Sequence, residues 1–345
     1  MSERPCWTSD YTFTVGMPHL QPFRLSEVEL VKVLGDFQWR SLARAAELPP
    51  AEIRDEAGHR LFASMVSIEL GLGPARRLED FDEGTTVQVW NRVGLFGKRL
   101  VEGFFLFDRE PLAEEVLAGV ADRQQLRAAG RPYLYMTNAF VAHTPGGAPA
   151  VQSPAVFRER VPAGLELEAT PVGIKEQMQV ERSGRIEAGE AEADPLALPC
   201  RDGPPLRYRL MPESDLSGAG VLYCARSVAV CNIALRRHLC RRLRRPLSAQ
   251  AVALLSTELR QIYYFGSAGP GETLLAEVEV GLLPLPSAPP SRWRAPLALI
   301  SRVDLRRASD GVLIVSSRAR QAMRIPGAMK SALTEAERFL GAVIG

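Results

Sequence analysis

The chain has 345 residues, 46% of them hydrophobic and 24% charged, so it can bury a full core and is long enough for two domains. Its 42 Lys and Arg residues nearly balance 40 Asp and Glu residues, which argues against a nucleic-acid-binding protein with one strongly basic face. The five cysteines are odd in number and lack paired CxxC spacing, so neither a disulfide framework nor a zinc site is indicated, and we expect a reducing compartment.

The N-terminal residues lack the apolar core of a signal peptide. No apolar run along the sequence approaches the ~20 residues that a membrane-spanning helix needs. We therefore expect a cytoplasmic protein that has no membrane partner.

The first half of the chain predicts a long helix followed by antiparallel strands. Ser26 and Glu29 form a capping box, and apolar residues continue at helical spacing to about Leu48. The segments that follow are rich in Val, Ile, Phe and Thr and are separated by glycines, a pattern typical of strands. The expected strands cover residues 59–70, 85–93, 98–107 and 133–143, with a charged helical stretch at 112–129 before the last of them.

A segment rich in Gly, Pro, Ala and Glu separates the two halves. Residues 184–195 carry several acids and few large apolar residues, and we interpret residues 151–205 as a connector with one strand near residues 169–180. The predicted domains on either side are an N-terminal domain at residues 1–150 and a C-terminal domain at residues 206–345.

The second half repeats the order of the first. Ser217 precedes a second long helical pattern as Ser26 precedes the first, and Thr273 corresponds to Thr85 after a similar turn. Both pairs are separated by roughly 190 residues, which indicates an internal duplication. The later segments expected are strands at 297–306 and 311–323, joined by a hairpin turn, and a final amphipathic helix at 332–344. The pattern predicts an α+β fold made of two similar units.

The strongest chemical signal is the segment from residue 211 to residue 223. Its small residues are expected to leave backbone N–H groups uncovered at a helix start, where the helix dipole favours a carbonyl oxygen that gains negative charge. Asp215 or Glu213 is a candidate general base and Tyr223 a candidate proton donor. Alternatively, Asp215 and Ser217 only cap the helix, and the glycines only allow close packing. The expected backbone donors are Gly218, Ala219 and Gly220.

Motifs spread over most of the chain outside the connector resemble those of one known family. They are Gly16-Met17-Pro18-His19-Leu20, Leu25-Ser26-Glu27, Leu34-Gly35-Asp36-Phe37-Gln38-Trp39, Arg60-Leu61-Phe62-Ala63-Ser64-Met65-Val66, Asp215 to Tyr223, Arg260-Gln261-Ile262-Tyr263-Tyr264-Phe265-Gly266 and Arg306-Arg307-Ala308-Ser309-Asp310-Gly311. With these motifs the chain is similar to the bifunctional acyltransferase/decarboxylase family of leinamycin polyketide biosynthesis.

The resemblance implies a double hot dog fold, in which each of two tandem units wraps an antiparallel sheet around a long helix. It also implies an enzyme of polyketide assembly that decarboxylates or transfers a malonyl or methylmalonyl group held as a thioester. The expected partners are acyl-CoA and an acyl carrier protein, with a homodimer left open. No cofactor is expected beyond the CoA or phosphopantetheine that carries the substrate.

Two departures from the family pattern bear on the chemistry. Phe62 stands where the family has its acyl-accepting tyrosine, and a phenyl ring has no oxygen with which to form an acyl-enzyme. Ser217 and Ser267 stand where the family pattern has Asn, so a single hydroxyl replaces a two-donor amide. Ser64 shares a strand face with Phe62 and is either a catalytic pocket residue or an ordinary strand hydroxyl.

Other candidates carry weaker signals. Asn91 lines a cleft or faces solvent, and the four histidines lack metal-ligand spacing, so no metal site is expected. His143 with Gly147 matches the start of a hot dog dehydratase motif, but it lies in a Pro-Gly turn, which disfavours dehydration. The arginine run at 236–245 is either a solvated helix end or a landing patch for CoA phosphates or an acidic carrier protein. Further residues expected to contact the substrate are Arg260 and Tyr263.

Three functions therefore remain open. The first is a malonyl-type decarboxylase that has lost or rerouted acyl transfer, because decarboxylation needs an oxyanion hole but not the missing tyrosine. The second is a non-catalytic module that binds an acyl thioester or a carrier protein, which the replacements at Phe62, Ser217 and Ser267 favour. The third is a simple thioesterase.

Overall fold

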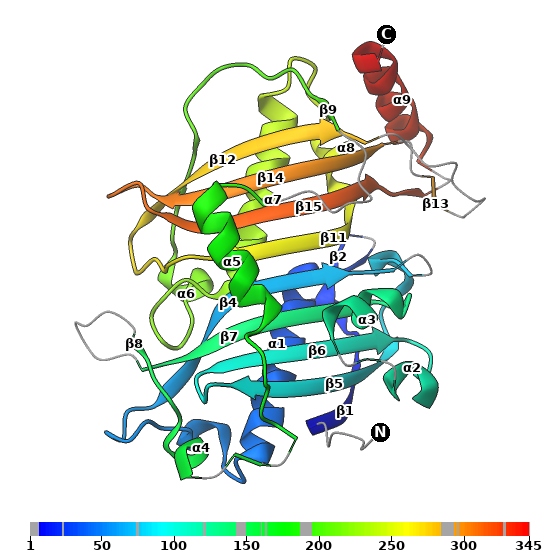
Figure 1. Cartoon of the computed structure of the whole chain (residues 1–345). Helices are drawn as coiled ribbons and strands as arrows, with labels where there is room; N and C mark the ends of the chain where they lie inside the picture. The colour runs from blue at the N-terminus through cyan, green and yellow to red at the C-terminus, as the bar shows by residue number, and fades with distance from the viewer. Residues whose placement is uncertain are drawn as a thin grey trace. The chain divides into compact units, whose positions relative to one another are not determined.

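In the computed structural model the chain forms two compact units (Figure 1). The first unit comprises Met1–Leu20 and Val28–Ser183, and the second comprises Gln21–Glu27 and Gly184–Gly345. The residues that the structure describes are 7–22, 24–73, 76–118, 120, 122–142, 150–159, 161–162, 164–186, 195–283, 293–294, 297–326 and 329–344. His143 and Gly147, the proposed start of a dehydratase motif, lie outside them.

The first unit contains an antiparallel sheet with the strand order β1-β5-β6-β7-β4. All of the strands expected from the sequence in this half are confirmed within a few residues, and β1 is an additional one. The bounds are β1 (Trp7–Thr14), β4 (Leu61–Gly71), β5 (Thr86–Phe96), β6 (Leu100–Asp108) and β7 (Tyr133–Ala142), with the short β8 (Ala150–Val151) on β7. The short elements of this unit are η1 (Met17–His19), η2 (Pro50–Glu52) and η3 (Leu78–Asp80). The short β2 (Leu20–Gln21) lies at the boundary in the chain, and β3 (Arg24–Leu25) belongs to the second unit.

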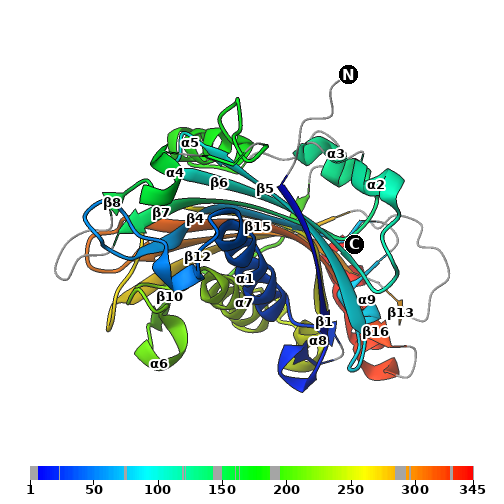
Figure 2. The ribbon, with the colours of Figure 1, turned by 90° about the horizontal axis from the view of Figure 1, so that it is seen from below.

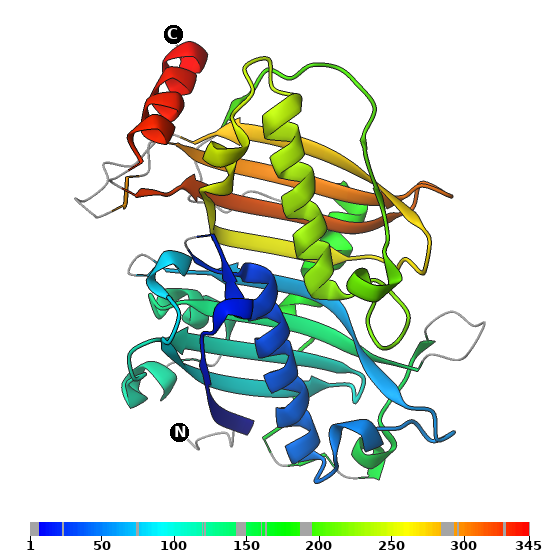
Figure 3. The same ribbon diagram turned by 180° about the vertical axis from the view of Figure 1, so that it is seen from behind.

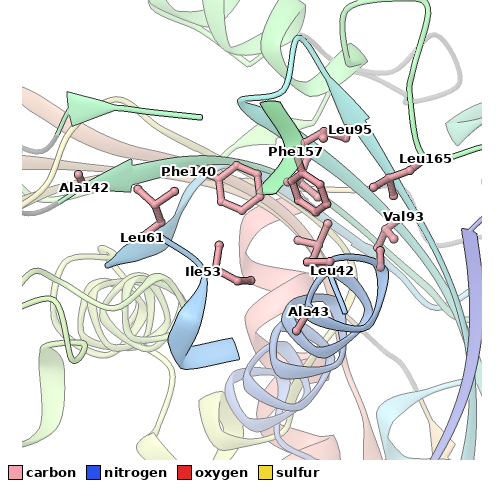
Figure 4. Close-up of a cluster of buried hydrophobic side chains, with 13 residues drawn as sticks. Leu42, Ala43, Ile53, Leu61, Val93, Leu95, Phe140, Ala142, Phe157 and Leu165 are labelled. Atoms are coloured by element: carbon pink, nitrogen blue, oxygen red, sulfur yellow. The ribbon is translucent and has the colours of Figure 1, made fainter. Parts of the chain in front are cut away.

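The predicted long helix of the first half is confirmed as α1 (Glu27–Ala45). In the first unit the sheet curves over α1, which lies on its concave face (Figure 2). Leu30, Leu34 and Leu42 are fully buried at helical spacing, so one stripe of α1 packs against the strands. Figure 4 shows the core at the C-terminal end of this helix, where Leu42 meets side chains from the sheet and from the segments beyond it.

Short helices cover part of the opposite face of the first sheet. The expected helical stretch at 112–129 is two short helices, and the strand expected near 169–180 is wrong, because α5 occupies that place. Gly173 and Val180 are the buried residues of α5, which packs on β4 and β7. The helix bounds are α2 (Glu114–Ala118), α3 (Arg123–Ala128), α4 (Ala155–Glu159) and α5 (Val172–Ser183). Structure therefore continues through much of the expected connector, and the first unit extends to Ser183.

The second unit has the same plan, with the strand order β11-β15-β14-β12-β10 and every pair antiparallel. Its long helix α7 (Cys224–Arg241) crosses the strands on one face of the sheet (Figure 3). The strands are β10 (Leu206–Arg209), β11 (Leu255–Tyr264), β12 (Thr273–Leu282), β14 (Ala298–Arg307) and β15 (Leu313–Met323), with short β9 (Leu196–Ala197), β13 (Trp293–Arg294) and β16 (Ile325–Pro326). The remaining helices are α6 (Pro212–Asp215), α8 (Ala249–Ala253) and α9 (Lys330–Ile344).

The second long helix begins later than the sequence pattern predicted. Residues 217–221 form a tight turn, closed by a hydrogen bond of 2.8 Å from the Ser217 N–H to the Val221 carbonyl oxygen. Gly220 has a φ of +74°, a conformation that an α-helix does not contain. The helix can therefore start only after this turn, and Tyr223 is its N-cap residue.

Candidate functional site

The structure divides the residues expected at the site between the two units. Phe62, Ser64 and Asn91 belong to the first unit, whereas Arg260 and Tyr263 belong to the second. The second unit also contains the whole segment from residue 211 to residue 223.

Phe62 and Ser64 lie two positions apart on β4, on one face of the strand as expected. They pair with Val141 and Ala139 of β7, and both are half-buried. The Arg60 guanidinium carbon lies 5.1 Å from the centre of the Phe62 ring, a cation–π arrangement. This strand face thus combines an apolar ring, a hydroxyl and a cation.

Asn91 lies in the core of the first unit. Its side chain is fully buried, and its Oδ1 accepts a hydrogen bond of 2.8 Å from the Ser41 hydroxyl. Ser41 in turn lies 2.9 Å from the Tyr11 hydroxyl. Asn91 therefore ties β5 to α1 and β1 and neither lines an open cleft nor faces solvent.

Arg260 is also buried, with 3% of its surface exposed. Its guanidinium forms an ion pair with Glu27 and donates to Asn232 Oδ1 at 2.6 Å and to the Ser317 hydroxyl at 3.0 Å. Tyr263 is likewise 3% exposed. Both residues thus lie in the interior of the second unit, which leaves them little surface for a substrate.

Asp215, at the end of α6, is fully buried and surrounded by donors. Its carboxylate accepts hydrogen bonds from the Met211 N–H at 2.8 Å, the Tyr208 hydroxyl at 3.1 Å and the Arg226 Nη2 at 2.8 Å. Burial opposes the charge, but the hydrogen bonds from Met211 and Arg226 outweigh it and lower the pKa of Asp215. A saturated carboxylate is a poor proton acceptor, so Asp215 holds the segment before α7 in place.

Two small residues of the turn donate their N–H groups to Ser217, within the turn itself. The Gly220 N–H donates to the Ser217 carbonyl oxygen at 2.9 Å, and the Ala219 N–H donates to the Ser217 hydroxyl at 3.3 Å. Gly218 and Gly220 are exposed, and a methyl group added to either would contact nothing within 4 Å. The glycines therefore serve the conformation of the turn and not close packing.

The N-terminal end of α7 contains the N–H groups that the turn was expected to supply. The Tyr223 N–H is taken by the Asp215 carbonyl oxygen at 2.9 Å, and the Arg226 N–H by the Tyr223 carbonyl oxygen at 2.9 Å. Within the described part of this unit, the N–H groups of Cys224 and Ala225 have no backbone carbonyl partner. They form the positive end of a long helix, where a carbonyl oxygen or an anion is favoured.

The comparisons with known proteins define the fold. No family model matches the chain, and no curated protein matches its sequence. The chain is similar to an oleoyl thioesterase structure from Lactobacillus plantarum, with a TM-score of 0.53, 11% identity and coverage of 92% of this chain and 95% of the other. It is also similar to the 12:0-ACP thioesterase from Umbellularia californica, with a TM-score of 0.51, 13% identity and coverage of 91% and 94%.

The chain has a double hot dog fold. In this fold α1 and α7 are the long helices of the two units, each held against a curved antiparallel sheet. The expectation drawn from the two repeats and from the family resemblance is thus confirmed for the fold.

Cys224 is a candidate site residue that the sequence analysis missed. It is the first residue of α7, half-buried, and its carbonyl oxygen accepts a hydrogen bond of 3.1 Å from the Tyr264 hydroxyl. Burial raises the pKa of the Cys224 thiol to about 12, although the N–H groups of Ala225 and Cys224 favour the thiolate. The sequence signal that could have indicated this residue is a cysteine that follows a Gly-rich turn. It was missed because the sequence pattern placed the start of the helix before that turn.

Two kinds of feature, a group of metal ligands and a membrane-spanning helix, are absent from the described residues. In that part of the chain, no group of three or more His, Cys, Asp or Glu side chains is placed to hold a metal ion. Among the same residues, every helix is too short or too polar to cross a bilayer.

Proposed function

We propose that this double hot dog protein hydrolyses an acyl thioester at the N-terminal end of α7. The observation that supports this most directly is the pair of N–H groups at Cys224 and Ala225, which lack a backbone carbonyl partner and follow a turn at residues 217–221 whose glycines are exposed. Thioester cleavage concentrates negative charge on the carbonyl oxygen. Fixed N–H donors at a helix start stabilise that charge without reorganisation during the reaction.

Asp215 and Tyr208 act as positioning residues in this proposal. Asp215 joins α6 to α7 in two ways, through its side chain to Arg226 and through its carbonyl oxygen to the Tyr223 N–H. These contacts fix the direction of the first turn of α7. Because the Asp215 carboxylate is already bonded by several donors, it does not supply the base.

Glu213 is the better candidate for a general base. It lies on α6 two residues before Asp215, and it is exposed. A carboxylate there can accept a proton from a water molecule that attacks the thioester carbonyl carbon. Hydrolysis then breaks the carbon–sulfur bond and releases a free acid and a free thiol.

Decarboxylation of a malonyl-type thioester is the second candidate. The same N–H pair would stabilise the oxygen of the enolate that forms when carbon dioxide leaves. Acyl transfer through residue 62 finds no support, because Phe62 has no oxygen to acylate. Hydrolysis ranks ahead of acyl transfer because it requires no acyl acceptor other than water, and ahead of decarboxylation because the similar structures are named as thioesterases.

The substrate class is proposed to be an acyl group on CoA or on an acyl carrier protein, in the cytoplasm. The similar structure from Umbellularia californica is named for a 12:0-acyl carrier protein substrate, which supports this substrate class. The length of the acyl chain that the present protein accepts is left to the experiment.

Mass spectrometry of products tests the proposal. Purified protein is incubated with octanoyl-, lauroyl-, malonyl- and methylmalonyl-CoA, and with the same groups on a carrier protein. Free acid and free thiol in equal amounts are expected from hydrolysis. Acetyl or propionyl thioesters would instead establish decarboxylation, and bound but unchanged substrates would establish a binding module.

A further inference from the structure

A cysteine and a histidine lie side by side near the C-terminal end of α7. Cys200 Sγ is 3.2 Å from His238 Nε2, and the same sulfur is 3.3 Å from the Leu198 carbonyl oxygen. Cys200 is exposed and His238 is half-buried. A thiol within hydrogen-bond reach of an imidazole is the arrangement in which a base activates a sulfur nucleophile.

Backbone contacts hold this pair in place. Cys200 forms an isolated β-bridge with Leu243, just beyond the end of α7. On either side of it, the Arg201 N–H donates to the Arg242 carbonyl oxygen at 2.6 Å, and the Arg244 N–H donates to the Pro199 carbonyl oxygen at 3.1 Å. The main chain on both sides of Cys200 is therefore tied to the C-terminal end of the helix that carries His238.

Arginines are numerous in the two segments that carry the pair. Arg242 is close enough to affect the ionisation of both Cys200 and His238. Asp202 is the exposed acid next to this group in sequence. An excess of guanidinium groups attracts phosphate, and Arg binds it with paired donors. Together with the half-buried Arg242, the arginines are Arg201, Arg237, Arg241, Arg244 and Arg245, all exposed.

We infer that Cys200 is a nucleophile, which His238 activates and which an acyl-CoA acylates. His238 Nε2 takes the thiol proton, and Cys200 Sγ attacks the thioester carbonyl carbon. The carbon–sulfur bond to CoA then breaks, and the departing CoA sulfur takes the proton back from His238. The products are S-acyl-Cys200 and free CoA, and the arginines hold the CoA phosphates during the exchange.

The charge states of the two side chains agree with this mechanism. Burial, followed by the Arg242 charge, lowers the pKa of His238, so its imidazole is neutral near pH 7 and can accept a proton. Burial raises the pKa of the Cys200 thiol, although Arg242 opposes that change. The thiol therefore needs a base in order to react at neutral pH.

This inference rests on the proposed acyl-thioester function but concerns a different place. His238 and Cys224 lie on one helix, and the rise of an α-helix separates them by roughly 20 Å. Acylation of Cys200 can therefore be measured separately from turnover at the N-terminal end of α7.

Mass spectrometry with peptide mapping tests the inference on the full-length protein. Octanoyl-CoA is expected to add one octanoyl group at Cys200, and His238→Gln is expected to slow that addition by about 100-fold or more. The same variant should slow alkylation of Cys200 by iodoacetamide. Alkylation of Cys240, on the same helix, is the internal control and should not change.

A second comparison tests the arginines. Arg201→Gln combined with Arg244→Gln should slow acylation by octanoyl-CoA about 10-fold, and should leave acylation by octanoyl-N-acetylcysteamine, which lacks phosphates, unchanged. The inference is overturned if Cys200 remains unmodified while the protein turns octanoyl-CoA over, or if His238→Gln has no effect on a folded variant. Failure of turnover with Cys200 still acylated would instead overturn only the proposed function.

Discussion

Glu27 at the start of α1 and Arg260 of β11 form an ion pair whose side chains are only 4% and 3% exposed. The Thr257 hydroxyl donates to the same carboxylate at 3.0 Å, while Asn232 and Ser317 accept from the guanidinium. Nearly every charged atom of the pair thus has a partner inside the second unit. Such a network stabilises only while it is complete, because either charge left alone in the interior is costly.

Arg260→Met should therefore destabilise the protein strongly. The variant leaves the Glu27 carboxylate buried without its cation, which costs about 3–5 kcal/mol in the free energy of unfolding. Urea denaturation followed by circular dichroism measures the change. Arg306→Gln is the matched control, because its pair with Glu277 at 3.4 Å is exposed and should cost less than about 1 kcal/mol. Equal losses in the two variants would contradict a structural role for the buried pair.

Cys224→Pro should abolish most of the turnover while the fold survives. Proline removes one N–H at the N1 position of a helix, where it is well tolerated. The preceding residue, Tyr223, has φ −71° and ψ 133°, which suits a residue before proline. Loss of one oxyanion donor should lower kcat by about 100- to 1000-fold in the thioesterase assay.

Cys224→Ala is the control for that variant. It keeps the N–H group and removes only the thiol, so turnover should stay within a few-fold of the parent protein. If the alanine variant is as inactive as the proline variant, the sulfur and not the backbone N–H carries the chemistry.

Glu213→Gln should lower kcat by about 100-fold or more and leave KM nearly unchanged, because the amide cannot accept the proton of the attacking water. Glu279→Gln on β12 replaces another exposed carboxylate of the same unit and should leave kcat as it is. Steady-state kinetics with octanoyl-CoA measures both variants. Equal rates for the parent and Glu213→Gln would remove Glu213 from the mechanism.

Asp215→Asn should destabilise the protein in a pH-dependent way. The folded-state pKa of Asp215 is lowered below its ordinary value of about 3.9, so its contribution is complete above about pH 4 and is lost as pH falls through the lower folded-state pKa. The difference in unfolding free energy between parent and variant should therefore be constant near neutral pH and shrink below about pH 4. Urea titrations at several pH values would contradict this if the difference grew on acidification.

Gly173→Ala should destabilise the first unit. A methyl group at Gly173 would overlap the hydroxyl oxygens of Ser67 and Thr137, where α5 lies on the sheet. Overpacking of this kind costs about 1–3 kcal/mol. Gly35→Ala on α1 is the contrast, because its methyl would meet nothing within 4 Å and should add about 0.5–1 kcal/mol through helix propensity. Thermal unfolding of the two variants should move in opposite directions.

The sequence by itself determined the repeated plan of the molecule. Hydrophobic spacing after Ser26 marks α1, and alternating segments such as residues 98–107 mark strands, because burial on one face requires those periods. The same signals placed the hairpin before Gly311 and the final helix. They misassigned α5, whose few buried residues, Gly173 and Val180, leave its apolar pattern weak.

Only the tertiary structure decided the roles of individual polar residues. Asn91 and Arg260 look like substrate contacts in sequence but are enclosed by Ser41 and Glu27, partners that lie 50 and 233 residues away. Asp215 likewise is a positioning residue because of the donors around it, and the N–H groups without a backbone carbonyl partner belong to Cys224 and Ala225 and not to the turn. Periodicity reports which face of an element is buried, whereas a side chain's role depends on what the fold brings next to it, and that information is not local in sequence.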